Sequence, residues 1–312
     1  MAKNSQSQIR QLRTLADDPE AQAVAALELL HGKPGRDLLM AALGVLVDHP
    51  YPPARPKLVE LLVHLSWDDG LHDPGSYVRR MVLDALRRIA KPEDITVMAR
   101  AVETYEFFAP DFKEDAVLLR ASALITLSAL DEELARYHAV RLLSDGFAQP
   151  MSGEPALTAV RVLVALGELV ALYAYAMQPD SATLPEVVSE ALRQLTAIPP
   201  LLIRGIVQRH GQSRQPVVLV SLFDLLLNHE EGPQGQDYLL ALLQDPPNAD
   251  LYRYLVTSMV ATGNTTLLDE LVESAHFEQD RGKVEVLVDA LGLVSGYRAV
   301  AEILPALEAR LE

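Results

Sequence analysis

Residues 73–91 read DPGSYVRRMVLDALRRIAK, and this stretch decides the fold class. Its apolar residues recur at offsets of 0, 3, 4, 7, 8 and 11. They are Val78, Met81, Val82, Ala85, Leu86 and Ile89. This spacing places them on one face of an α-helix. The preceding Asp73-Pro-Gly supplies turn residues and a carboxylate near the helix start, where the helix dipole favours negative charge. The stretch therefore predicts an amphipathic helix that packs through one face.

Helical patterns of this kind continue along most of the chain. The same periodicity returns over 284–294, and the segments 117–130 and 157–177 are so apolar that we expect them to be covered on several sides. Gly and Pro clusters divide the chain into roughly fourteen predicted helices of about 10–18 residues. No alternating run is bounded by an Asn-Gly or Asp-Gly hairpin turn. The sequence predicts an all-α fold, in which 157–177 is one buried helix rather than a membrane span because Arg161 and Glu168 interrupt it.

Composition limits the functions that this chain can have. The 312 residues are 49% hydrophobic, which is enough for a large core, and none is cysteine, which excludes thiolate zinc sites and cysteine catalysis. A formal charge of −16 opposes binding to nucleic acid or to an anionic membrane. The N-terminal segment has no apolar stretch of signal-peptide length, so we expect a cytoplasmic protein.

Two stretches share a pattern at an offset of 41 residues. Asp73-Pro-Gly-Ser-Tyr-Val-Arg79 precedes Ala85-Leu86, and Glu114-Asp-Ala-Val-Leu-Leu-Arg120 precedes Thr126-Leu127. A third helix begins about forty residues later, after Glu154-Pro155. The pattern resembles the HEAT-repeat family, in which a turn acid, a following Val-Arg and a later Ala-Leu define the inner helix of each helical pair. The resemblance specifies a fold and brings no catalytic residue with it.

The resemblance implies a right-handed superhelical α-solenoid of about six or seven helical hairpins, since one hairpin cannot bury its own apolar face. We expect a single repeat domain over 1–312, with divergent N-terminal repeats (1–72), the best-matching repeats (73–177) and divergent, acidic C-terminal repeats (178–312). Asp73, Arg79, Glu114 and Arg120 are expected to be structural, with each arginine bridging to an acid of the neighbouring repeat.

The predicted function is a non-enzymatic scaffold or adaptor that binds another protein along the concave face of the solenoid. Two enzymatic alternatives of similar helical build are the HEAT-like alkylpurine DNA glycosylases and the HEAT-like bilin lyases. Candidate phosphate contacts form one basic stripe and a smaller one; they are Arg79, Arg80, Arg87, Arg88 and Lys91, and Arg204, Arg209, His210 and Arg214. The strong negative charge disfavours the glycosylase, and no motif in the chain supports the lyase.

No established catalytic or cofactor motif is present in the sequence: Gly-x-Ser-x-Gly, both glycine-rich phosphate loops and HExxH are missing. The densest group of potential metal ligands is His64, Asp68, Asp69 and His72, of which His64 and Asp68 would share a helix face. Its spacing matches no known zinc or calcium site. We therefore predict no catalytic, cofactor-binding or metal-binding residues, and expect these acids to cap helices and form turns.

Two segments are candidates for binding a partner protein. The first holds Tyr105, Phe107, Phe108 and Phe112, which either seal the space between helix pairs or form an exposed aromatic anchor. The second lies in the acidic C-terminal third, where residues 215–312 hold 5 Lys and Arg against 16 Asp and Glu. Its candidate residues are Asp269, Glu270, Glu273, Glu278 and Asp280. They would attract a partner with a basic surface, or serve only to solvate the protein.

Overall fold

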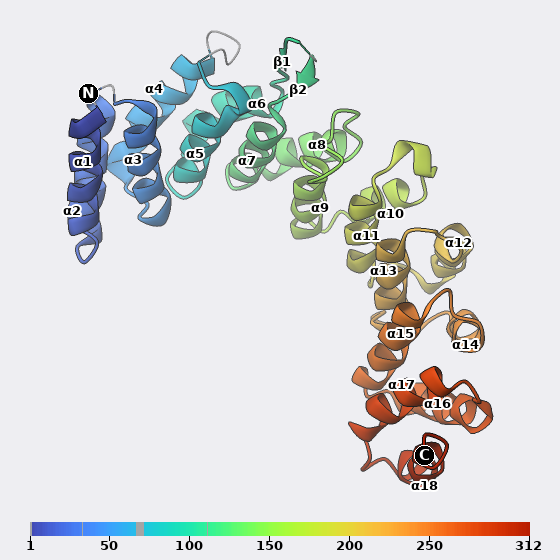
Figure 1. Cartoon of the computed structure of the whole chain (residues 1–312). Helices are drawn as coiled ribbons and strands as arrows, with labels where there is room; N and C mark the ends of the chain where they lie inside the picture. Colours follow the sequence, from blue (N-terminus) through green and yellow to red (C-terminus); the bar gives the residue numbers. More distant parts are fainter. Residues whose placement is uncertain (1, 33, 67–71, 111) are drawn as a thin grey trace. The chain divides into compact units, whose positions relative to one another are not determined.

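The computed structural model describes residues 2–32, 34–66, 72–110 and 112–312, and this part of the chain is almost entirely helical (Figure 1). It contains eighteen α-helices of 8–13 residues, so the predicted all-α class is confirmed. These eighteen helices exceed the roughly fourteen that the sequence predicted. The expected number of six or seven hairpins was derived from that lower number of helices. The chain divides into two compact units, residues 1–168 (unit 1) and 169–312 (unit 2).

Unit 1 has two rows of helices. Its elements are α1 (Ala2–Thr14), α2 (Pro19–His31), α3 (Arg36–Asp48), α4 (Arg55–Ser66), α5 (Tyr77–Leu86), α6 (Ile95–Val102), α7 (Val117–Ser128), α8 (Glu132–Leu143) and α9 (Ala156–Ala165). The odd-numbered helices α1, α3, α5, α7 and α9 pack side by side in sequence order, and we call them the odd row of unit 1. The even-numbered helices α2, α4, α6 and α8 each pack against the next odd helix. The odd row thus keeps one side free of the even helices.

Unit 2 repeats this arrangement. Its elements are α10 (Leu169–Ala176), α11 (Pro185–Gln194), α12 (Pro200–His210), α13 (Pro216–Leu227), α14 (Gln236–Gln244), α15 (Ala249–Ala261), α16 (Thr265–Phe277), α17 (Arg281–Gly292) and α18 (Arg298–Glu308). Helices α11, α13, α15 and α17 pack in sequence order, while α14, α16 and α18 form a second row beside them.

The burial of α5 and α7 explains how the odd row is built. In α5 the predicted apolar face is buried, with Val82 and Leu86 fully inaccessible, and Arg80 is exposed. Helix α7 lies between α5 and α9, and nine of its twelve residues are buried. Such a helix must be apolar around most of its circumference. Segment 117–130 is covered on several sides, as the sequence predicted.

The prediction of one helix over 157–177 is wrong. The chain forms α9 and α10 there, and Gly167 between them has φ +73°. Glycine adopts this left-handed conformation without the steric cost that a Cβ imposes, so it ends helices efficiently. None of the helices in the described residues is both long and apolar enough to cross a membrane.

One short hairpin departs from the expectation of no strands. Strands β1 (Phe107–Phe108) and β2 (Lys113–Glu114) pair antiparallel in the connection between α6 and α7, with Phe107 opposite Glu114. The pairing is only two residues long, too short to give the alternating pattern by which strands are recognised in a sequence.

Candidate functional site

A buried ion-pair network holds the start of α5. The Arg79 guanidinium is fully buried and donates to Asp73 Oδ2 at 3.3 Å and to Glu106 Oε2 at 2.7 Å, with a further short bond to Glu106 Oε1. It also donates to the Ser76 hydroxyl at 3.0 Å. Asp73 accepts the backbone N–H groups of Val78 and Arg79. Asp73 therefore caps the helix, while Arg79 ties it to the segment that follows α6.

A second network at the start of α7 has the same organisation. Arg120, also fully buried, donates to Glu114 at 2.6 and 3.0 Å and lies 3.3 Å from Asp145, in the connection that follows α8. The Tyr105 ring covers the guanidinium at 4.1 Å, and its hydroxyl donates to Asp145 Oδ2 at 3.1 Å. Cation–π contact with a desolvated guanidinium adds to the ion pairs.

The two networks form one continuous chain of buried charges. The backbone N–H of Glu106 donates to Glu114 Oε1 at 3.3 Å, which links the Arg79 network to the Arg120 network. Asp73 and Glu114 precede their arginines by six residues, and each arginine reaches an acid 25 or 27 residues later. The structure thus brings together the four residues that the sequence expected to be structural, and these contacts fix α5 and α7 in the odd row.

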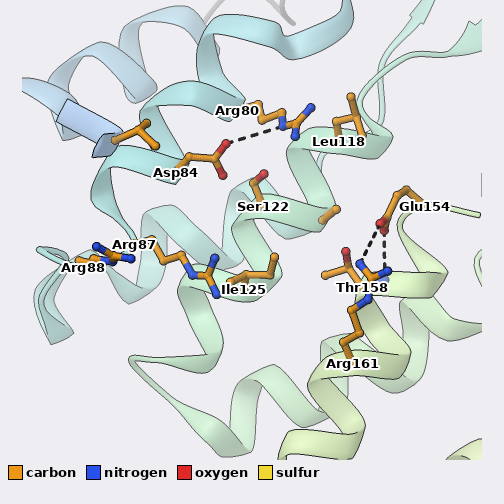
Figure 2. A pocket seen from close by; sticks show the side chains of 12 residues that line it. Arg80, Asp84, Arg87, Arg88, Leu118, Ser122, Ile125, Glu154, Thr158 and Arg161 are labelled. Atoms are coloured by element: carbon orange, nitrogen blue, oxygen red, sulfur yellow. Dashed lines mark hydrogen bonds and ion pairs between the residues drawn. The ribbon is translucent and has the colours of Figure 1, made fainter. Parts of the chain in front are cut away.

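A pocket of about 380 Å³ opens on the odd row of unit 1 (Figure 2). Helix α5 supplies Arg80 and Asp84 to it, and Arg87 and Arg88 follow directly after that helix. The remaining lining residues come from α3, α7, the segment just before α9 and α9 itself: Val47, Leu118, Ala121, Ser122, Ile125, Glu154, Thr158 and Arg161. Figure 2 shows Arg87 and Arg88 on one side of the pocket, Arg161 and Glu154 on the other, and Ser122 and Ile125 between them.

The pocket is basic although the chain is acidic. Four guanidinium groups face two carboxylates, Asp84 and Glu154. Arg80 lies 3.7 Å from Asp84 and Arg161 lies 3.8 Å from Glu154, both longer than a normal hydrogen bond. Among the described residues, none forms a hydrogen bond or ion pair with the guanidinium of Arg87 or Arg88, the two other lining arginines.

Asp84 lines the pocket from α5 and is partly buried there. Burial raises the pKa of the Asp84 carboxyl above its ordinary value, and the charges of Arg80 and Arg87 oppose that rise. The Asp84 carboxyl is thus partly desolvated. Water reaches it less freely than it reaches a carboxyl in an ion pair on the surface.

The sequence identified part of this site. Of the predicted basic stripe, Arg80, Arg87 and Arg88 line the pocket, whereas Arg79 points into the core. Sequence reasoning missed Arg161. The repeat spacing could have found it, because steps of 41 and 40 residues from Arg80 reach Ala121 and then Arg161, and all three line the pocket.

The residues of the smaller basic stripe, which lies in unit 2, differ in their surroundings. Arg209 donates to the Gln178 carbonyl and pairs with Asp180, and His210 is buried against the Ala176 carbonyl at 2.8 Å. Burial lowers the pKa of the His210 imidazole, which favours its neutral form. Arg204 and Arg214 are exposed.

The aromatic segment between α6 and α7 is partly packed and partly exposed, and its expected role as an anchor for a partner stays a prediction. Tyr105 is half-buried against Arg120, while Phe107 is 43% and Phe112 68% exposed. Phe147, from the connection after α8, contacts Tyr105 and Phe107 edge-on, with ring centroids 5.6 and 5.2 Å apart. Phe108 is half-buried in β1. Tyr105 and Phe147 therefore join two successive connections, and the outer rings remain accessible.

The acidic candidates in unit 2 lie on α16 and the connection after it. Asp269 accepts the Tyr297 hydroxyl at 2.8 Å, and Asp280 caps α17 by accepting the Lys283 N–H. Glu278 accepts the backbone N–H groups of residues 279 and 280. Glu270 and Glu273 lie on α16, half-buried and exposed respectively. Three of the five acids thus stabilise local structure, and their expected role in docking a basic partner stays a prediction.

The candidate metal cluster is only partly placed. Asp68 and Asp69 lie outside the described residues, while His64 and His72 are exposed. Within the described ranges, no group of three or more His, Asp or Glu side chains is arranged to hold a metal ion.

No family model and no curated protein matches the chain.

Proposed function

We propose that this chain is a HEAT-like, right-handed superhelical α-solenoid that acts as a non-enzymatic binding scaffold, with the odd row of unit 1 as its docking surface. The alternation of odd and even helices in each unit supports the repeat architecture. The recurrence of the buried arginine networks at an offset of 41 residues supports it further. Stacked repeats of this kind offer extended surfaces on which a partner can bind.

One observation carries the functional part of the proposal. In a chain of net charge −16, four arginines converge on one pocket, and two of them have no hydrogen bond or ion pair with any described residue. Like charges brought together in one pocket repel one another. An anionic partner would relieve this repulsion and use the guanidinium groups as donors.

A pair of charge variants tests the docking surface. The 312-residue chain, its Arg87→Glu/Arg161→Glu variant and an Arg298→Glu control are immobilised, and native extract is passed over each. Arg298 is exposed and paired with Glu302 in unit 2, so its replacement changes charge without touching the pocket. We expect proteins captured by the wild type and the control to be lost from the pocket variant. Capture that is identical for all three would refute the proposed surface.

The two enzymatic alternatives make different predictions. A glycosylase would bind duplex DNA at about 0.15 M salt and release a base from alkylated DNA, and a bilin lyase would co-purify with a chromophore or its carrier protein. Small-angle X-ray scattering tests the architecture, because an elongated solenoid has a radius of gyration well above the roughly 20 Å of a compact domain of this length.

A further inference from the structure

We propose that the arginine pocket of unit 1 recognises a phosphorylated side chain on a segment of the partner protein. This inference rests on the proposed scaffold function and specifies the chemistry of the ligand. It is carried by the charge of the pocket, by the freedom of two of its guanidinium groups and by its size.

The charge of the pocket matches that of a phosphate monoester. Arg80, Arg87, Arg88 and Arg161 contribute four positive charges, and Asp84 and Glu154 contribute two negative charges. The difference is two positive charges. A phosphorylated serine, threonine or tyrosine carries about −1.5 to −2 at neutral pH, whereas a single Glu or Asp side chain carries −1. A phosphoryl group therefore neutralises the site and a carboxylate neutralises half of it.

The arginines can rearrange around a ligand at little cost. Arg87 and Arg88 have no internal ion pair among the described residues that would have to be broken. Arg80 and Arg161 are held only at 3.7 and 3.8 Å by their acids, and their side chains are 45% and 62% exposed. A guanidinium presents its N–H groups in a planar fork that fits two oxygens of a phosphoryl group. Arginines on both sides of the pocket could thus bind one phosphoryl group between them (Figure 2).

The same pocket fits a protein segment better than a nucleic acid or a membrane. Its volume of about 380 Å³ accommodates a phosphoryl group and one or two neighbouring side chains. Leu118 and Ile125 provide apolar contact for such neighbours. A polyanion would also meet Asp84 and Glu154 and the excess of acidic residues in a chain of net charge −16, which penalise each additional phosphate.

The test uses defined probes and the whole 312-residue chain. A fluorescein-labelled octapeptide of Ala and Gly with one central phosphoserine is titrated by fluorescence anisotropy, beside the same peptide with Ser or Glu at the centre. We expect the phosphorylated peptide to bind at least about tenfold more tightly than the Ser peptide, since charge-assisted bonds to several guanidinium groups are lost without it.

Three variants locate the binding. The Arg87→Ala/Arg161→Ala variant is expected to lose about tenfold or more in affinity for the phosphorylated peptide, and the Arg298→Ala control is expected to keep it. Asp84→Asn removes a negative charge from the pocket and frees Arg80, so it is expected to tighten binding by about threefold. Circular dichroism confirms that each variant is folded.

Several outcomes would overturn the inference. They are equal affinity for the Ser and phosphoserine peptides, binding that is unchanged in the double arginine variant, and tighter binding to a 12-base-pair DNA duplex or to phosphatidylserine vesicles than to the peptide. The scaffold function and the phosphate requirement are distinguished by the capture experiment. If captured proteins depend on the pocket arginines but are still bound after phosphatase treatment, the docking surface is retained and the phosphate requirement is wrong.

Discussion

Replacing Arg79 by Met tests whether the buried network organises the odd row of unit 1. The Arg79 guanidinium makes ion pairs with Asp73 and Glu106, whose side chains are at most 2% exposed. Without it, Asp73 keeps two backbone N–H donors, but among the described residues only the Ser76 hydroxyl, at 3.4 Å, still donates to the Glu106 side chain. Breaking a buried pair by removing one partner costs about 3–5 kcal/mol, because a charge is left buried without compensation. We expect Arg79→Met to lower the stability of α5 by an amount in this range.

Native-state hydrogen exchange of the α5 and α7 amides is the suitable assay, since repeat proteins open locally and exchange reports the local free energy. Arg80→Met is the matched control: the Arg80 side chain is 45% exposed and lies 3.7 Å from Asp84, so its loss should cost less than about 1 kcal/mol. Adding Glu106→Gln to Arg79→Met should recover about 1–3 kcal/mol, because it removes the buried charge that the first substitution leaves without compensation. If Arg79→Met and Arg80→Met destabilised α5 equally, the reasoning would be refuted.

Three further changes test local features of the fold. Burial lowers the pKa of His210 below its ordinary value of about 6.5, so the folded state favours the neutral ring. The contribution of this ring to stability should be complete above pH 6.5 and fall as the pH drops below it. His210→Asn should therefore make the thermal midpoint less dependent on pH between 7 and 5. Gly235→Ala should destabilise unit 2 by about 1 kcal/mol or more in urea unfolding, since Gly235 has φ +62° and a Cβ would lie 3.2 Å from Leu226; unchanged stability would contradict this. Gly44→Ala in α3, where a Cβ meets nothing within 4 Å, should instead raise stability by about 0.5–1 kcal/mol, and a loss would show that the helix interior is more crowded than it is in the structure.

Helical periodicity predicted the fold well where one face of a helix is polar. The pattern in 73–91 gave α5 with its buried face, and the helix expected over 284–294 corresponds to α17. It failed over 157–177, where apolar residues on all sides removed the periodicity and hid the break at Gly167. Helices as short as eight residues, such as α6 and α10, also explain why the predicted number was too low. They contain little more than two turns, over which a period is hard to recognise.

The candidate site was predictable only in part. The basic stripe pointed to Arg80, Arg87 and Arg88, whereas Arg79, expected to be structural, shares a helix face with Leu83 and Leu86, both fully buried. Which arginines remain without a partner depends on contacts between helices about 40 and 80 residues apart. Those contacts are fixed by packing, and no local pattern encodes them.

A crystal structure of the protein with the phosphoserine octapeptide tests the central claim most directly. We predict the phosphoryl group in the pocket of unit 1, with its oxygens about 3 Å from guanidinium nitrogens of Arg87 and Arg161, and with the peptide lying over Ser122 and Ile125. A peptide bound at another surface, or bound at the pocket with its phosphoryl group turned toward solvent and away from these arginines, would contradict the account.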